Sequence, residues 1–207
     1  RYAGLRKAYG TFTASNETRE DGKASGKNVT ISKELSDKDL LKLWNDHLSG
    51  HQSVGIVPID EHNTCVWGAI DVDEYQLDLK DLALKIAKQK LPLVVCRSKS
   101  GGAHIYLFLI EPVAASMVQR KLRQLAAAIG YGQAEIFPKQ TQLLLKRGDR
   151  GSTLNMPYFG GENSTRYAYG KEGEALTPEE FLNYCREIEL TPKTLEGLEA
   201  SPLNDSI

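Results

Sequence analysis

The spacing of hydrophobic and polar positions along the chain follows two patterns, one typical of helices and one typical of strands. Apolar residues three or four positions apart predict helices over residues 36–48, 77–90, 113–129 and from 177 to about 185. Short apolar runs predict strands over residues 53–58, 64–73, 92–97, 104–110, 134–138, 153–159 and 166–170. Several neighbouring strands have short links, which favours an α/β (α+β) fold with a mixed, largely antiparallel sheet and helices on its faces.

The same pattern suggests three regions. Residues 1–34 begin basic and aromatic and become polar, which predicts a loop or a weak hairpin around Asp21-Gly22 that belongs to the domain. Residues 35–190 carry the regular periodicity and form the main domain. Residues 191–207 are polar, and we expect a loose tail. The strand at 104–110 is expected to end before Pro112.

Composition narrows the class of protein. The chain has 207 residues, 41% of them hydrophobic, and a formal net charge of −1, so nucleic-acid binding would need a local basic patch. No apolar run reaches about 18 residues and no signal peptide is visible, which predicts a cytoplasmic protein without a membrane segment. Three widely spaced cysteines predict reduced thiols. Because the chain begins with Arg1, we expect it to be part of a longer polypeptide.

Asp71 and Asp73 interrupt the apolar strand WGAIDVD. Alternate strand residues share a face, so the two α-carbons would lie roughly 6.5–7 Å apart. Two carboxylates this close repel each other in a dry setting unless a cation lies between them, and hard oxygen ligands suit Mg²⁺ or Mn²⁺. Taken alone, this common pair is more often explained by a strand end that reaches water.

A serine- and glycine-rich loop, CRSKSGGAH, separates the next two strands. Glycines let backbone N–H groups approach an anion, while hydroxyl, basic and imidazole groups add donors and charge. The candidates for binding a triphosphate are Arg97, Ser98, Lys99, Ser100, Gly101, Gly102 and His104. A glycine hairpin with a buried histidine would explain the same residues without a ligand.

Two further segments add polar residues to apolar strands. Glu135 in AEIFPKQ is a candidate third metal ligand, and Lys139 follows it. Asn155 follows the basic loop that contains Arg147 and Arg150, and it needs a partner if it is buried. Together, three acids beside an anion-binding loop suit phosphoryl or nucleotidyl transfer with two divalent ions. Each segment alone also fits an ordinary edge strand or turn.

The strings AIDVD, SKSGGAH and EIFPKQ, in this order, resemble the three motifs of the archaeo-eukaryotic primase superfamily. Those motifs are a strand DxD, a strand-opening Ser…His and a strand acid. The similarity is nearest to the primase-polymerase branch of phages, plasmids and TOTE conflict systems. It covers about residues 35–170 and includes HLSG (47–50), GIVPI (55–59) and GSTLNMPYFGG (151–161).

The resemblance implies an RRM-like catalytic core and a DNA primase, a DNA polymerase or both, acting in DNA replication. It implies that Asp71, Asp73 and Glu135 are the catalytic metal ligands. It also implies that the Ser100–Gly102 loop and His104 hold the triphosphate. Lys139 and Asn155 would contact the incoming nucleotide. Glu135 replaces the aspartate of many members. The helical domain or zinc motif that many relatives use for initiation is not apparent in the sequence, so extension is better supported than unaided priming.

The partners expected on this basis are a single-stranded DNA template, a primer strand and nucleoside triphosphates, together with a helicase or further domains of a longer polypeptide encoded by a bacterium, phage or plasmid. The candidate nucleic-acid contacts are the basic residues Lys23, Lys27, Arg147 and Arg150. Two alternatives stay open: a non-catalytic nucleic-acid-binding domain, which a missing acid would favour, and another metal enzyme such as a nuclease, which would not require the triphosphate loop.

Overall fold

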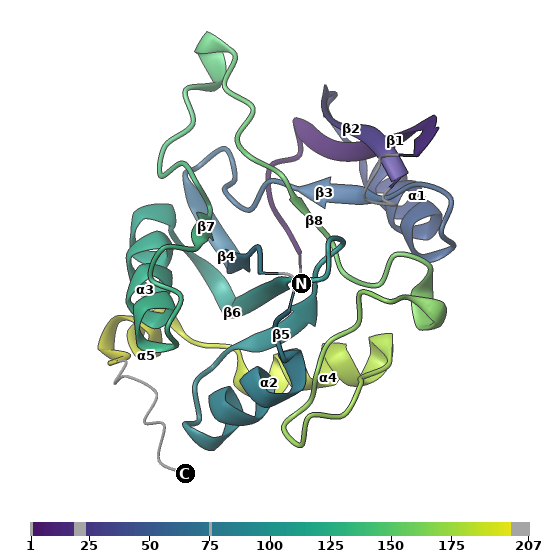
Figure 1. Ribbon diagram of the computed structural model, residues 1–207. Coiled ribbons are helices and arrows are strands. Elements are labelled where there is room, and N and C mark those ends of the chain that lie inside the picture. The colour runs from purple at the N-terminus through teal and green to yellow at the C-terminus, as the bar shows by residue number, and fades with distance from the viewer. Residues whose placement is uncertain (1, 19–23, 75, 200–207) are drawn as a thin grey trace.

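The computed structural model describes residues 2–18, 24–74 and 76–199, and in 13–18 and 24–28 it describes the backbone only. Eight strands form two antiparallel four-stranded sheets within these residues, in the orders β2-β1-β3-β8 and β5-β6-β4-β7. The strands of the first sheet are β1 (Ala8–Thr18), β2 (Ala24–Ser32), β3 (Val54–Ile56) and β8 (Leu154–Asn155). Those of the second are β4 (Thr64–Val72), β5 (Val94–Arg97), β6 (Ala103–Ala114) and β7 (Glu135–Phe137). The predicted α/β class with antiparallel strands is confirmed (Figure 1).

Helices lie on both faces of the second sheet: α2 (Leu79–Lys88), α3 (Ala115–Ala128) and α5 (Pro192–Gly197) on one face, and α4 (Pro178–Ile188) on the other. Helix α1 (Asp37–Leu48) packs beside β3 of the first sheet, and η1 (Leu145–Arg147) and η2 (Gly161–Asn163) are short 3₁₀ turns. Local sequence explains where α1 and α4 begin, because Ser36 and Thr177 each form a reciprocal capping box with the acid three residues later. No helix in the described part of the chain is long and apolar enough to cross a membrane.

Alternation along β4 and β6 divides the core into two parts. Ile70, Val72 and Ile105 point to the face that α2, α3 and α5 cover. Trp67 and Tyr106 point to the opposite face, where they pack with residues of β3, β8 and α4. The second sheet is therefore buried on both faces, and Figure 1 shows α3 to the left of it and the β1–β2 hairpin at the upper right.

Buried His47 ties the first sheet to α1. Its Nε2 donates to the carbonyl oxygen of Pro157 at 2.7 Å, and its Nδ1 accepts from the backbone N–H of Val54 at 3.0 Å. Both ring nitrogens are thus used within the fold. The string HLSG therefore marks a structural contact between α1, β3 and the segment after β8.

Some predicted elements differ from the observed ones. β6 runs through Pro112 to Ala114, because the pairing with β4 is irregular between Cys65 and Trp67 and a proline is tolerated at such a bulge. Residues 8–18 and 24–32 form the hairpin rather than a loop, and Asp21-Gly22 lie outside the described residues. Only residues 154–155 of the strand predicted at 153–159 form one, and residues 166–170 contribute isolated bridges.

The expected loose tail is also partly wrong. Residues 192–197 form α5, whose Leu195 is fully buried against the core that α2 and α3 share. Thr191 caps this helix by accepting from the backbone N–H of Thr194 at 3.0 Å. One buried leucine and a cap are enough to order a short segment that composition alone describes as polar.

Candidate active site

Asp71 lies at the centre of the second sheet, near the end of β4. The antiparallel register places it directly opposite His104 on β6 and directly opposite Glu135 on β7. Residues opposite each other in an antiparallel pair have β-carbons about 5 Å apart and share a face. The fold therefore brings together three side chains that are well separated along the chain.

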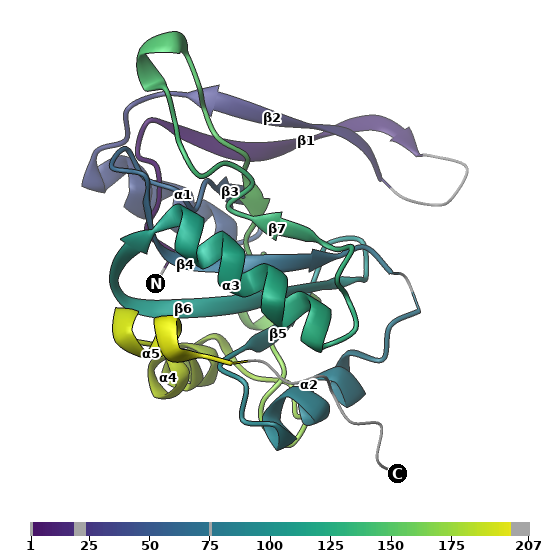
Figure 2. The same cartoon turned by 90° about the vertical axis from the view of Figure 1, so that its left-hand side faces the viewer.

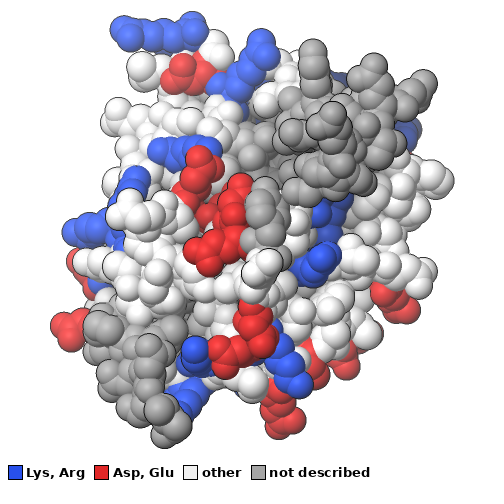
Figure 3. All heavy atoms as spheres, in the orientation of Figure 1, with Lys and Arg blue, Asp and Glu red and all other residues white. Residues whose placement is uncertain are grey.

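The acids perturb one another. Burial, followed by the charges of Asp73 and Glu135, raises the pKa of Asp71 to about 6, while Lys139 acts in the opposite direction. Asp73 lies just beyond the end of β4 and is exposed. Figure 3 shows acidic side chains gathered near the middle of this face, with basic side chains on either side. Asp71 is thus the buried member of an acidic cluster, with part of its side chain open to solvent.

Glu135 and Lys139 form an ion pair. The ammonium Nζ lies 2.6 Å from Glu135 Oε2, and it also lies 5.0 Å from the ring centre of Phe137. Within the described residues, no group of three or more His, Cys, Asp or Glu side chains is arranged to hold a metal ion. Lys139, which the sequence suggested for the nucleotide, is placed by the structure beside an acid.

The loop between β5 and β6 lies against the end of β4. Ser98 and Ser100 bring their hydroxyl oxygens within 3.3 Å of each other, and Ser100 donates to Asp73 Oδ1 at 3.2 Å. Gly102 is required here, because a β-carbon at this position would lie 2.1 Å from the carbonyl oxygen of Val72. Gly101 has a φ of +98°, a conformation that favours glycine. The two glycines therefore let the loop touch the strand that carries both aspartates.

His104 is almost fully buried at the start of β6. Its Nε2 lies 3.4 Å from Asp71 Oδ1, and its Nδ1 lies 3.2 Å from the hydroxyl of Tyr106. Burial, and then the charge of Arg166, lowers the pKa of His104 to about 4, so the ring is neutral at pH 7. The Tyr106 hydroxyl donates to the backbone carbonyl of Asn155 on β8 at 3.4 Å, which connects the two sheets beside His104.

The remaining predicted residues are distributed around this centre. Arg97 is half-buried at the end of β5, and the ammonium of Lys99 lies over the ring of Phe12 on β1. Arg147 and Arg150 are exposed in the segment between β7 and β8, which projects from the molecule in Figures 1 and 2. Lys27 lies on β2 but its side chain is not described, and Lys23 lies outside the described residues.

Arg166 is not among the residues predicted from the sequence. This residue precedes the segment that forms an isolated bridge between Ala168 and Cys96 of β5, and its charge acts on His104 and Lys99. The alternation of RYAYG indicated a strand, but the neighbour of that strand depends on pairing between residues about 70 positions apart in the chain. No local pattern places Arg166 near the 98–102 loop.

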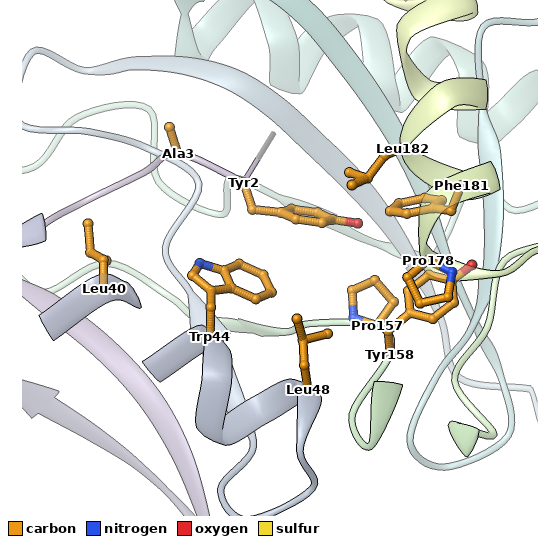
Figure 4. A pocket seen from close by; sticks show the side chains of 10 residues that line it. All are labelled: Tyr2, Ala3, Leu40, Trp44, Leu48, Pro157, Tyr158, Pro178, Phe181 and Leu182. Carbon is orange, nitrogen blue, oxygen red and sulfur yellow. The ribbon is translucent and has the colours of Figure 1, made fainter. Parts of the chain in front are cut away.

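An apolar pocket of about 370 Å³ lies apart from these residues. It is lined by side chains from α1, α4 and the N-terminal segment, including Trp44, Phe181 and Tyr2 (Figure 4). No charged side chain lines it, so it holds none of the groups described above.

Comparison with known families yields a match. The model of the archaeo-eukaryotic primase domain of TOTE conflict systems matches residues 6–176. The matched range includes both sheets, the acidic cluster, the 98–102 loop and Arg166. The comparison with curated proteins found no match to the chain.

Proposed function

The chain belongs to the archaeo-eukaryotic primase family of TOTE conflict systems, and from this premise we propose that it is a template-dependent nucleotidyltransferase that acts as a DNA primase, a DNA polymerase or both. The family itself supports a primase-like enzyme of the nucleotidyltransferase type. The finer activity is our proposal, and it depends on the chemistry of the residues around Asp71.

The single observation that carries the proposal is the position of Asp71 between His104 and Glu135 in the sheet register. Burying a carboxylate next to two others is unfavourable, as the raised pKa of Asp71 indicates. A fold that served only its own stability would gain by placing a neutral side chain there. The arrangement is therefore better explained by a bound cation or a reacting group that needs these charges.

The carboxylate donors suit hard divalent cations by their chemistry, although within the described residues, with Lys139 paired to Glu135, they are not grouped as metal ligands. Three carboxylates on neighbouring chain segments are the ligands that Mg²⁺ and Mn²⁺ prefer. We propose that Asp71, Asp73 and Glu135 hold two such ions, and that Lys139 neutralises Glu135 when the ions are absent. When bound, divalent ions in such a site supply Lewis acidity toward a hydroxyl nucleophile and charge neutralisation at the leaving pyrophosphate.

The chain's own residues would bind and orient the nucleotide. The hydroxyl groups of Ser98 and Ser100 and the backbone of Gly101 and Gly102 lie beside Asp73, where they can donate to phosphate oxygens. Because the Tyr106 hydroxyl donates its one proton to the carbonyl oxygen of Asn155, the single N–H of neutral His104 is directed at Tyr106 through Nδ1 and holds the ring in place. We propose that a bound phosphate favours a second proton on His104, at Nε2, which then donates to a phosphate oxygen. Positioning and charge are the main contributions that a protein makes to this class of reaction.

Template and primer are proposed to contact basic residues around this face. Arg147 and Arg150 are exposed on the projecting segment between β7 and β8, where they can reach the phosphates of a bound strand. Lys23 and Lys27 belong to the N-terminal region that contains the hairpin and remain proposals from sequence. A helicase or further domains of a longer polypeptide are proposed partners.

Primer extension tests the proposed function. The chain is incubated with a primed single-stranded template, labelled ribo- or deoxynucleotides and Mg²⁺ or Mn²⁺, with an unprimed template in parallel. We expect incorporation by the wild type, none by Asp71→Ala, and full activity in Asp81→Asn, an exposed acid on α2. Template binding without incorporation by the wild type would instead support a non-catalytic nucleic-acid-binding domain, and template degradation would support a nuclease.

A further inference from the structure

Arg166 carries a half-buried positive charge that has no negative partner in the described part of the chain. Its Nη1 is enclosed and makes no hydrogen bond there, and no described carboxylate forms an ion pair with it. Its guanidinium carbon lies over the face of Phe159, 4.9 Å from the ring centre. Burial lowers its pKa. A buried and unpaired guanidinium destabilises the folded state, so its presence is better explained by a bound ligand than by a contribution to stability.

Strand pairing places Arg166 beside the 98–102 loop. Cys96 of β5 bridges Ala168 in antiparallel fashion, and the backbone N–H of Arg97 donates to the carbonyl oxygen of Tyr167 at 3.0 Å. Continued by two residues, this register brings Arg166 opposite Ser98. Alternate residues share a face, so Arg166 lies on the face of the sheet that carries His104 and Asp71.

Positive charge lies on the side of His104 that faces Arg166, whereas negative charge lies on the side that faces Asp71. The charge of Arg166 acts on both His104 and Lys99, and burial together with Arg166 lowers the pKa of Lys99 to about 8. Two cations, Arg166 and Lys99, therefore lie near each other, and no described carboxylate forms an ion pair with either of them. Asp71 and Glu135 lie on the opposite side of His104, whereas Asp73 contacts the 98–102 loop through Ser100.

We propose that Arg166, together with Lys99, binds the phosphate chain of the incoming nucleoside triphosphate from the side of His104 opposite Asp71 and Glu135. The guanidinium presents a planar fork of donors that fits phosphate oxygens, and an anion supplied by the ligand removes the repulsion between the two cations. The identity of the anion rests on the proposed function, whereas the anion-binding role of Arg166 does not.

The test uses inorganic tripolyphosphate, which carries the phosphate chain without a base or sugar, titrated calorimetrically into the chain with Mg²⁺. Arg166→Met keeps the apolar stem of the side chain but removes the guanidinium and its charge. We expect its affinity for tripolyphosphate to be about 10- to 100-fold weaker than that of the wild type, as for loss of a charge-assisted contact. Arg186→Gln is the matched control, since exposed Arg186 bonds to Asn183 on its own helix, and its affinity should equal the wild type's.

Thermal unfolding of the same variants separates binding from structure. Because Arg166→Met removes an unpaired buried charge, its Tm without ligand should equal or exceed that of the wild type. An affinity within twofold of the wild type overturns the proposal, whatever the Tm, and so does a wild type that fails to bind tripolyphosphate at millimolar concentration. If Arg166→Met does not fold, Arg166→Lys decides: severalfold weaker binding supports the proposal and unchanged binding overturns it.

Failure here is distinguishable from failure of the proposed function. A wild type that incorporates nucleotides while Arg166→Met binds tripolyphosphate normally refutes only the role of Arg166. A wild type that binds tripolyphosphate through Arg166 but incorporates no nucleotide refutes the polymerase activity and leaves the phosphate site standing.

Discussion

Asp71→Asn should make the metal-free protein more stable while it abolishes nucleotide incorporation. Asparagine has the shape of aspartate but stays neutral next to Asp73 and Glu135, whose charges oppose ionisation of Asp71. The same substitution removes the carboxylate that we propose to bind metal. Stability and activity should therefore change in opposite directions, which is expected where a site is kept for function at a cost to the fold.

The size of the effect follows from the pKa of Asp71. Raising the pKa from 3.8 to about 6 corresponds to about 3 kcal/mol between the charged and neutral forms in the folded state. The folded pKa is the higher one, so the stabilising contribution of this group is fully present below about pH 4 and is lost as the pH rises through about 6. At pH 7.5, the neutral amide of Asp71→Asn should therefore raise the free energy of unfolding by about 3 kcal/mol, or Tm by about 6–12 °C.

The assay is thermal unfolding in EDTA at several pH values between about 4 and 8, beside primer extension with Mn²⁺. The stability gain of Asp71→Asn should shrink as the pH falls and vanish near pH 4. The control Asp81→Asn removes an exposed acid whose ion pair with Lys85 contributes little, so its Tm should stay close to that of the wild type at every pH. A lower Tm for Asp71→Asn at pH 7.5, or retained incorporation, would refute the reasoning.

Three other changes probe the groups around Asp71. Because the pKa of Lys99 is about 8, nucleotide affinity, measured as KM, should fall as the pH rises from about 7.5 to 9.5. Lys99→Arg should remove this pH dependence, and a fall that persists in Lys99→Arg would show that another group causes it. Gly102→Ala should lower the free energy of unfolding by about 1–3 kcal/mol and raise KM for nucleotide, since its β-carbon would meet the Val72 carbonyl oxygen; an unchanged Tm would contradict this contact. Lys139→Met should tighten Mn²⁺ binding severalfold in a calorimetric titration, because the ammonium that holds Glu135 is gone; weaker binding would show that Lys139 supports the site instead.

Much of the fold follows from local signals. The capping boxes at Ser36 and Thr177 fix where two helices begin, and the strands that carry Asp71, His104 and Glu135 were each indicated by a short apolar run. What local signals do not contain is how distant strands pair. The bulge that carries β6 past Pro112 depends on the register with β4, and α5 depends on the burial of Leu195 against α2 and α3.

The candidate site divides in the same way. Asp71, Asp73, His104 and the 98–102 loop could be assembled from the sequence because their motifs stand at the ends of adjacent strands. Arg166 could not, because it reaches the loop only through the bridge between Ala168 and Cys96. The ion pair between Glu135 and Lys139 was also not predicted, because the resemblance assigned Lys139 to the nucleotide rather than to the acid.

The most direct test of the proposed metal site is anomalous scattering from crystals of the chain grown with Mn²⁺ and a non-hydrolysable nucleoside triphosphate. We expect manganese peaks in contact with the carboxylates of Asp71, Asp73 and Glu135, with the phosphate chain between these peaks and the 98–102 loop. Manganese bound elsewhere, or a nucleotide seated away from these three carboxylates, would contradict the proposal that the acids exist to hold divalent ions against a triphosphate.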